Sequence, residues 1–534
     1  MSTKAWNRVI GLAAKQMRPF NDDLIYNYRK DKIAKIPEFL DKMFQQVMEF
    51  FNGQMTYRGY RALTPEERID YIISNQITKG SWSIRDTATI TMRFEFEFQG
   101  KPHYIYVDVP YMVADRLVYN DTEYYPFFPI VERSGVNRTE NGSIIVKVMR
   151  VPITFGRRSS DRYKIISVNG RTYPEILVTV KIYQGKNSGK KSEHIPLVLY
   201  PLCKYGYLET MKRFGIDPKH LSLSDKFDTQ DKVYEYFIMP DGHRYLKVHR
   251  SLLSDTYKLR MVLSLYRIFV EIPEFEESDA FSDFTGYYLT VLGKFTSSKD
   301  TSMTKLLLPN AQKHLAMTDP MLDLVAKDQL RQINCNCNDI YDLLHWMYYN
   351  IDDQLVSYDP TNLFDKKIES LDNLACRVAR NIAYAQYMII NSKKAILDRK
   401  TVEQFCKRAS QRASWLAADE NDRTCKIFGT NPALYNDSYL LSIGLKRCLM
   451  LESVSSSFSR KNWKPSKKNR KPNKSKTPPH LLRAHPSQLI VTSILDIPAS
   501  SPIVTGSLNP YTEIDQFGNI VRPAYADEID DVFN

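Results

Sequence analysis

A long stretch rich in lysine and arginine interrupts the C-terminal part of this chain and limits how that part can fold. Residues 453–495 contain ten Lys/Arg and no Asp/Glu. A run of one charge repels itself, so we expect a loop here, with residues 460–483 as its most basic part. Turn-rich sequence with Pro486, Pro498, Gly506 and Gly518 follows and reaches the end of the chain. An ordered Pro/Gly segment after a basic loop suggests a nucleic-acid site that is cut off in mid-domain.

The positive charge of the chain is concentrated in this stretch. The formal net charge is +13, of which the stretch supplies +10, so the remaining sequence carries only +3 (13 − 10). A local basic block beside structured sequence favours nucleic acid or an anionic surface as the partner. A solubilising loop without a partner is the alternative that charge alone leaves open.

Length, cysteine content and hydropathy place the chain among intracellular multidomain proteins. A chain of 534 residues exceeds one ordinary core, so we expect two or more domains. Seven scattered cysteines predict reduced thiols, and C-x-C at 335–337 lacks the second pair that a zinc site needs. The N-terminus lacks a signal-peptide pattern, and no apolar run reaches 18 residues, so neither secretion nor a membrane span is expected.

Hydrophobic periodicity predicts an α+β, multidomain fold. Residues 93–98 alternate with period two, 99–102 form a turn and 103–107 return, which predicts a hairpin. Further strands are expected at 117–119, 143–148, 163–168 and 176–183. Apolar residues at helical spacing predict helices at 33–50, 258–269, 338–349, 371–389 and 400–416, and strand-like sequence resumes at 485.

Residues 185–192 superficially resemble a phosphate-binding P-loop. The true motif has four residues between its glycines and Lys-Ser/Thr directly after the second, whereas this segment has three, and Lys191 intervenes. The segment also follows a strand in a β-rich region. We therefore expect a charged hairpin tip.

No complete catalytic or metal site emerges from the sequence. The nine histidines lack paired ligand spacing, and His485 is expected to have a structural role in an extended segment before Pro486. The carboxylate clusters at 352–353 and 527–531 suggest magnesium only weakly, because neither has alternating Asp on a tight loop. Solvated surface is the expected environment of both.

Three ordered motifs resemble the first half of the β subunit of multisubunit RNA polymerases. Residues 484–487 (A-H-P-S) and 495–498 (L-D-I-P) fall in register with the family's V-H-P-T…P-I-E-T-P segment, although Ala499-Ser500 replaces its Glu-Gly. Residues 109–112, 117–123 and 133–136 resemble I-P-L-M, F-V-I-N-G-T-E and R-S-P-G-V. Residues 365–371 resemble the segment that precedes a long helix of the family.

The resemblance implies an architecture of protrusion, lobe and fork. Residues 1–150 and 356–435 would form the protrusion, 151–355 an inserted lobe, and 436–534 the start of the fork. Because the family's β continues beyond this point, the chain is most similar to the split β subunits of giant bacteriophage RNA polymerases.

The resemblance also implies site residues in the fork. Residues 440–448 resemble P-L-S-E-I-T-H-K-R-R, with Leu445 in place of the histidine and Cys448 in place of the second arginine. These positions line the rifamycin pocket of bacterial enzymes, so we predict resistance to rifamycins. The residues expected near nucleic acid or the incoming nucleotide are Lys446, Arg447, Arg460, Lys461, Lys464, Lys467, Lys468, Arg470, Lys471 and Asp496.

The leading hypothesis is a subunit of a DNA-directed RNA polymerase that forms one side of the DNA/RNA cleft. Mg²⁺ would be bound by aspartates of a β′-like partner, because the family's D-F-D-G-D motif does not occur here. Expected partners are the C-terminal β-half polypeptide, β′-like subunits, template DNA and the RNA transcript. The expected location is the infected bacterial host, with packaging in the virion left open. A non-enzymatic viral DNA-binding or virion protein is the alternative, and an unrelated enzyme is a third.

Overall fold

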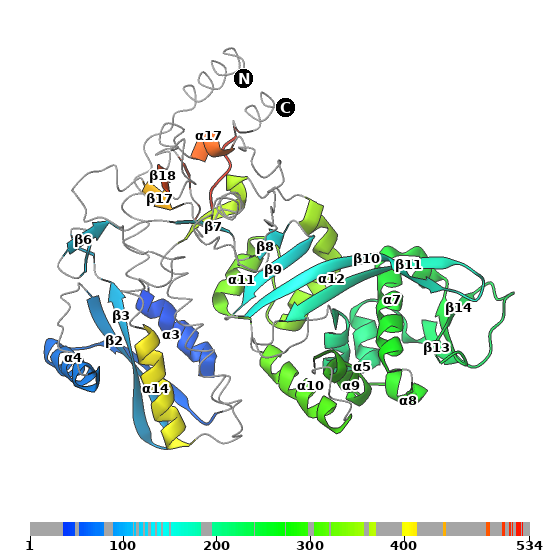
Figure 1. Cartoon of the computed structure of the whole chain (residues 1–534), viewed down its shortest axis with the longest axis horizontal. Helices are drawn as coiled ribbons and strands as arrows, with labels where there is room; N and C mark the ends of the chain where they lie inside the picture. Colours follow the sequence, from blue (N-terminus) through cyan, green and yellow to red (C-terminus); the bar gives the residue numbers. More distant parts are fainter. Residues whose placement is uncertain are drawn as a thin grey trace, which may run out of the picture. The chain divides into compact units, whose positions relative to one another are not determined.

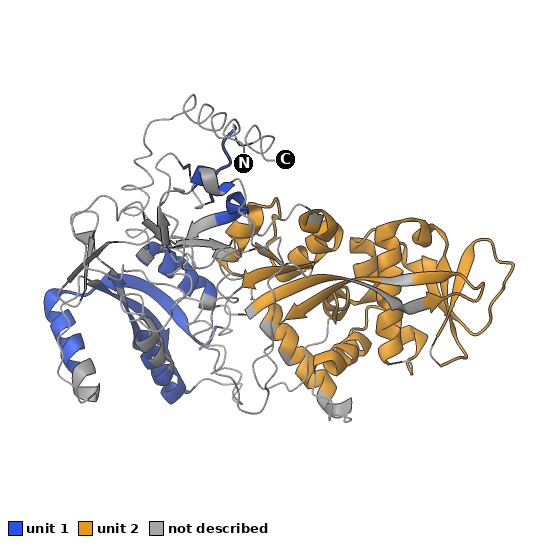
Figure 2. Cartoon of the chain, turned by 45° about the horizontal axis from the view of Figure 1, so that its top comes forward, with its two compact units in different colours: residues 1–134, 359–534 blue, residues 135–358 orange. Residues whose placement is uncertain are grey.

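The chain divides into two compact units of mixed helix and sheet. Unit 1 comprises residues 1–134 and 359–534, and unit 2 comprises residues 135–358 (Figure 2). The computed structural model describes residues 36–48, 53–79, 89–110, 112–113, 117–120, 123–126, 130–133, 136–139, 142–148, 151–182, 195–239, 241–272, 274–296, 304–319, 322–356, 362–369, 398–413, 442–444, 487–491, 505–507, 512–513, 515, 519–524 and 526.

The first sheet of unit 1 confirms the predicted hairpin. Strands β1 (Thr56–Ala62), β2 (Thr89–Phe98) and β3 (Lys101–Pro110) form an antiparallel sheet in the order β1-β2-β3. Gln99 and Gly100 connect β2 to β3 with φ values of 50° and 72°. Two successive positive φ values are typical of a two-residue type I′ turn, which matches the twist of the strands it joins.

Two helices that the sequence predicts pack on this sheet (Figure 1). Phe44 of α3 (Ile36–Val47) lies 4.8 Å from Phe94 and 5.4 Å from Phe96, measured between ring centroids. Helix α14 (Arg399–Ala413) runs along β3, where the Tyr106 N–H donates to Ser410 Oγ at 3.0 Å. The helix thus satisfies a backbone donor on an edge strand that would otherwise remain open. The helix predicted at 371–389 lies outside the described residues.

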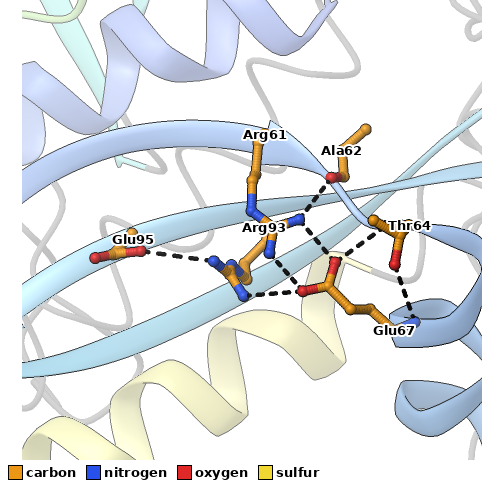
Figure 3. Close-up of polar contacts among 6 residues, drawn as sticks. All are labelled: Arg61, Ala62, Thr64, Glu67, Arg93 and Glu95. Carbon is orange, nitrogen blue, oxygen red and sulfur yellow. Dashed lines mark hydrogen bonds and ion pairs between the residues drawn. The ribbon is translucent and has the colours of Figure 1, made fainter.

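A reciprocal cap begins helix α4 (Pro65–Lys79) and links it to the sheet (Figure 3). The Thr64 N–H donates to Glu67 Oε2 at 3.0 Å, and the Glu67 N–H donates to Thr64 Oγ1 at 3.3 Å, which is the capping-box arrangement. Arg61 binds the Glu67 carboxylate with both Nη atoms at 2.7 and 2.5 Å. The Arg61 guanidinium, followed by the Thr64 N–H, lowers the pKa of Glu67 to about 2.

Short strands complete the described part of unit 1. Strands β4 (Met112–Val113), β5 (Leu117–Asn120) and β6 (Glu123–Pro126) form an antiparallel meander, which confirms the strand expected at 117–119. Strand β7 (Ile130–Arg133) belongs to another sheet, described with the candidate site.

Unit 2 is built on a five-stranded antiparallel sheet in the order β12-β11-β10-β9-β8. The predicted strand at 143–148 is confirmed, and that at 163–168 is the end of a longer strand. The strands are β8 (Val136–Thr139), β9 (Ser143–Val148), β10 (Val151–Ile166), β11 (Thr172–Ile182) and β12 (Ile195–Pro196). Because β8 and β9 belong to the same sheet as β10, the compact unit begins at Gly135.

Helices pack on this sheet and share one continuous apolar core with it (Figure 1). The helices expected at 258–269 and 338–349 are confirmed and somewhat longer, as α7 (Thr256–Glu271) and α12 (Ile340–Val356). The other helices of the unit are α5 (Leu199–Arg213), α6 (Ser251–Ser254), α8 (Glu277–Ala280), α9 (Gly286–Thr296), α10 (Thr304–Thr318), α11 (Leu324–Arg331) and the 3₁₀ turn η3 (Pro218–His220).

Helix α5 is kinked at a glycine that no other residue could replace without strain. Gly206 has φ 78° and ψ −175° inside the helix. A Cβ at this position would lie 2.4 Å from the Asp283 Cα, so backbone approach also demands glycine. The Asp283 carboxylate then accepts hydrogen bonds from the N–H groups of Leu208 and Glu209, which begin the second half of the helix.

A small antiparallel sheet with the order β13-β15-β14 completes unit 2. Its strands are β13 (Leu221–Ser224), β14 (Tyr234–Ile238) and β15 (Tyr245–His249).

Within the described ranges the cysteines are free thiols. Cys203, Cys335, Cys337 and Cys406 are buried, and the Sγ atoms of Cys335 and Cys337 lie 3.8 Å apart. No helix in that part of the chain is long and apolar enough to cross a membrane.

Candidate nucleic-acid interface

Four segments that lie far apart in the sequence meet in one sheet of unit 1. The strand order is β16-β7-β17-β18, with β16 (Lys366–Glu369), β17 (Ser442–Gly444) and β18 (Thr505–Ser507). Strand β7 pairs antiparallel with β16 through Arg133 and Lys366, and parallel with β17 through Ile130 and Gly444. Strands β7, β16 and β17 overlap the polymerase-like motifs at 133–136, 365–371 and 440–448, so the fold brings these three motifs together.

A buried hydrogen bond fixes the segment that follows the basic stretch. The short helix α17 (Ser487–Val491) packs against η5 (Leu363–Asp365), the 3₁₀ turn that leads into β16. The Leu363 N–H donates to Oγ of the fully buried Ser487 at 2.8 Å. The expectation of strand-like structure directly after 485 is wrong, because residues 487–491 are helical. His485 itself lies outside the described residues.

The C-terminal turn-rich segment also contacts this sheet. The Ile520 N–H donates to the carbonyl of Lys366 at 3.3 Å, and the Val521 N–H donates to the carbonyl of Glu513 at 2.9 Å. The Arg522 guanidinium, on an exposed residue, lies 5.4 Å from the Phe364 ring centroid, within cation–π range. Two segments that follow the basic stretch, α17 and residues 520–522, therefore contact the same few residues, 363–369, whereas β17, which precedes the stretch, pairs with β7 and β18.

These contacts tether both ends of the basic segment. The chain leaves β17 at Gly444 and returns in α17 at Ser487, and the residues between carry 12 Lys/Arg and one Glu. Both described ends of the basic segment, Gly444 and Ser487, therefore lie at or beside this sheet. Positive charge of the kind that the sequence between them carries attracts a polyphosphate backbone.

The ten residues expected near nucleic acid or nucleotide all lie outside the described residues. Lys446 and Arg447 follow β17 directly, and Arg460, Lys461, Lys464, Lys467, Lys468, Arg470 and Lys471 lie between β17 and α17. Asp496 lies between α17 and β18. Their proximity to nucleic acid remains a prediction.

The structure adds two cationic residues that were not singled out as site residues. Lys366 is 2% exposed and stands opposite Arg133 in the β16–β7 register. Arg522 lies beside η5. Lys366 falls within the motif at 365–371, but only the strand pairing places it beside β7, at the edge of this sheet.

Asp352, one of the two carboxylates considered for magnesium, is bound by arginines instead. Arg157 Nη1 donates to Asp352 Oδ1 at 3.2 Å, and Nη2 of the buried Arg260 donates to Oδ2. The expected solvated environment holds for the exposed Asp353, whereas Asp352 is only partly exposed, at 28%. No group of three or more His, Cys, Asp or Glu in the described part of the chain could hold a metal ion.

The P-loop-like segment 185–192 and the acidic segment 527–531 lie outside the described residues. The strands on either side of the former, β11 and β12, pair antiparallel. The segment therefore joins two strands of one sheet and does not lead directly from a strand into a helix, as a P-loop does.

The fold and site define a two-unit α+β protein in which a basic segment is anchored on a sheet of polymerase-like motifs. Residues 7–413 match the family described as "Non-virion RNA polymerase subunit". Because the match covers most of the 534 residues, the chain belongs to this family and is a subunit of a viral RNA polymerase. No curated protein matches the chain. The family match ends before β17, so it does not include the basic segment.

Proposed function

We propose that this chain is the N-terminal half of a β-like subunit, and that its basic segment binds nucleic acid beside the active centre of the polymerase. The observation that carries the proposal is the β16-β7-β17-β18 sheet, which gathers the polymerase-like motifs and tethers both ends of the basic segment. Unit 1 would correspond to the protrusion with the start of the fork, and unit 2 to the lobe.

The chain's own part in nucleotidyl transfer is to guide nucleic acid. Mg²⁺ would be bound by a β′-like partner, since the described residues offer no cluster of carboxylates for it. The C-terminal β-half would be a further partner. Lysines and arginines of the basic segment would neutralise phosphates of DNA or RNA and release their counterions.

Exchange of four lysines tests this proposal. In the assembled polymerase, Lys461, Lys464, Lys467 and Lys468 are replaced by Gln, and DNA affinity is measured as a function of salt concentration. Each lysine that contacts a duplex phosphate contributes about 0.9 to the slope of log K against log salt. We expect weaker binding, a flatter slope and reduced RNA synthesis.

A matched variant controls for net charge. It carries Gln at four exposed lysines elsewhere, Lys101, Lys212, Lys400 and Lys407. Equal slopes for both variants would show that the basic segment makes no special phosphate contact. Assembly without any transcription from DNA would favour the alternative of a non-enzymatic DNA-binding protein.

A further inference from the structure

The small sheet of unit 2 has one face in the core and one face toward solvent. Phe237, Leu246 and Val248 are buried, so the alternate side chains of β14 and β15 point outward. We call this outward surface the aromatic face. Its accessible residues are Tyr234, Ile238, Tyr245, Lys247 and His249, while Tyr236, on the same side of the sheet, is only 6% exposed.

Two ion pairs of Glu235 stabilise the core-facing side of the small sheet. Glu235 points into the core side and is fully buried, and its Oε2 lies 3.3 Å from Arg250 Nε and 3.8 Å from Arg171 Nη1. Arg171 belongs to the turn between β10 and β11, so the carboxylate connects that turn to the small sheet. The aromatic face is therefore a supported surface, which lowers the entropic cost of binding a partner.

One end of the aromatic face is apolar and exposed. Ile238 and Tyr245 are paired in register, and the Phe227 ring lies 4.9 Å from the Tyr245 ring. Phe227 is 45% exposed and Ile238 is 43% exposed. The Phe227 ring contacts the Tyr245 ring, and Ile238 lies opposite Tyr245 in the strand register. A contiguous exposed patch of large apolar side chains is typical of an interaction site.

The other end of the aromatic face is cationic. Lys247 Nζ lies 4.2 Å from the Tyr234 ring centroid and 5.9 Å from that of Tyr236. His249 stacks on His220 at 4.4 Å, and Tyr234 meets His249 edge-on. A carboxylate approaching this end would meet Lys247 and no outward-pointing acidic side chain of β14 or β15.

The charge balance around the aromatic face favours a protein over nucleic acid. Residues 217–250 contain six Asp/Glu and six Lys/Arg, which gives little net attraction for a phosphate backbone. Four of the aspartates accept backbone hydrogen bonds in turns: Asp217, Asp228, Asp231 and Asp241. Asp231 also accepts a hydrogen bond from the Tyr236 hydroxyl at 3.0 Å and lies near enough to Lys247 to interact with its charge, but it forms no direct ion pair with this lysine within 4 Å. The surface thus combines an apolar patch with one lysine.

We propose that the aromatic face is the docking surface for another polypeptide of the polymerase, which covers Phe227, Ile238 and Tyr245 with apolar side chains and places a carboxylate on Lys247. This inference rests on the chain being a polymerase subunit. It assigns unit 2 a role in assembly that is separate from the basic segment of unit 1.

Hydroxyl-radical footprinting of the isolated chain and of the assembled polymerase tests the proposal. We expect Phe227 and Tyr245 to lose at least three-quarters of their reactivity on assembly, and a lysine cross-linker to join Lys247 to another subunit. Equal reactivity in the two samples would overturn the proposal. So would cross-linking of the aromatic face to DNA or RNA instead of protein.

Substitutions provide the second test. Ile238→Asp and Lys247→Glu should each weaken retention of one and the same subunit at least tenfold on a tagged chain. Phe284→Asp is the matched control, because Phe284 is 62% exposed in the same unit and lies outside the aromatic face. Circular dichroism checks that all three variants fold, and retention unaffected by either substitution would contradict the proposal.

The outcomes separate this inference from the proposed function. A chain that assembles and transcribes while its aromatic face stays reactive would overturn only the docking surface. A chain that enters no RNA-synthesising complex would overturn the proposed function.

Discussion

Nη2 of Arg138 in β8 donates to Oε1 of Gln354 in α12 at 2.7 Å. Arg138 lies three residues after Gly135, where unit 2 begins, and Gln354 lies four residues before Tyr358, where it ends. The hydrogen bond therefore joins the two ends of the inserted unit. Arg157 and Arg260 meet Asp352 on the same helix, two residues earlier. This arrangement of arginines near the C-terminal end of α12 also complements the helix dipole.

Replacement of Asp352 by Ala should destabilise unit 2 strongly. Arg260 is 3% exposed, and the substitution would leave its charge buried without a carboxylate. Breaking a buried ion pair typically costs about 3 kcal/mol or more. Urea unfolding followed by tryptophan fluorescence measures the change in the free energy of unfolding. Asp353→Ala, at the exposed neighbouring position, should change it by less than about 0.5 kcal/mol. Equal effects of the two substitutions would contradict the ion-pair argument.

Substitution of Gly206 by Ala should destabilise the protein through both backbone conformation and steric overlap. The residue has φ 78°, and the new Cβ would lie 2.4 Å from Asp283 Cα. Gly215→Ala separates the two effects, since Gly215 has φ 66° but no atom within 4 Å of the added Cβ. A left-handed conformation alone costs about 1–2 kcal/mol. Thermal unfolding should therefore give a clearly larger loss for Gly206→Ala, and similar losses would argue against the close approach.

Stability should decrease as the pH falls below 6.5, in part because of His314. This side chain is buried, with Nε2 2.8 Å from the Tyr200 hydroxyl, and burial lowers its pKa from 6.5 to about 4. A lowered folded-state pKa means that the unfolded chain binds the proton first. The contribution of the neutral, buried imidazole to the free energy of unfolding is complete above pH 6.5. It is lost between pH 6.5 and 4, at up to about 1.4 kcal/mol per pH unit.

Urea midpoints measured between pH 7.5 and 4 check the contribution of His314. His314→Gln should flatten the decline in this range, even if the variant is less stable at neutral pH. His243→Gln, at an exposed position, is the control and should leave the decline as it is. An unchanged slope in His314→Gln would assign the pH dependence to other groups.

Transcription by the assembled polymerase should resist rifamycins. In the proposed alignment of residues 440–448 with the bacterial β motif, Leu445 and Cys448 replace a histidine and an arginine, so the hydrogen-bonding groups of the pocket would differ. RNA synthesis is measured against drug concentration beside a bacterial polymerase as the sensitive control. Inhibition of both polymerases at the same concentration would contradict the prediction.

Local patterns in the sequence predicted local structure well. The alternation at 93–98 predicts β2, because one face of the strand is buried and side chains alternate between faces. The apolar spacing at 258–269 predicts α7, because side chains three and four residues apart lie on the same face of a helix. The extent of β10 was not predictable, since residues 151–166 continue as one strand only by pairing along β11. Helix α17 was also missed, because Ser487 is fixed there by Leu363, which is distant in the sequence.

The sequence by itself determined the concentration of positive charge, the separate helices and strands, and the order of the polymerase-like motifs. Each of these depends on residues that are neighbours in the chain. Only the tertiary structure decided that 130–133, 366–369, 442–444 and 505–507 form one sheet, and that the basic segment is tethered at both ends to it. Strand pairing over such separations depends on backbone hydrogen bonds between segments whose side chains carry no local signal of their partners.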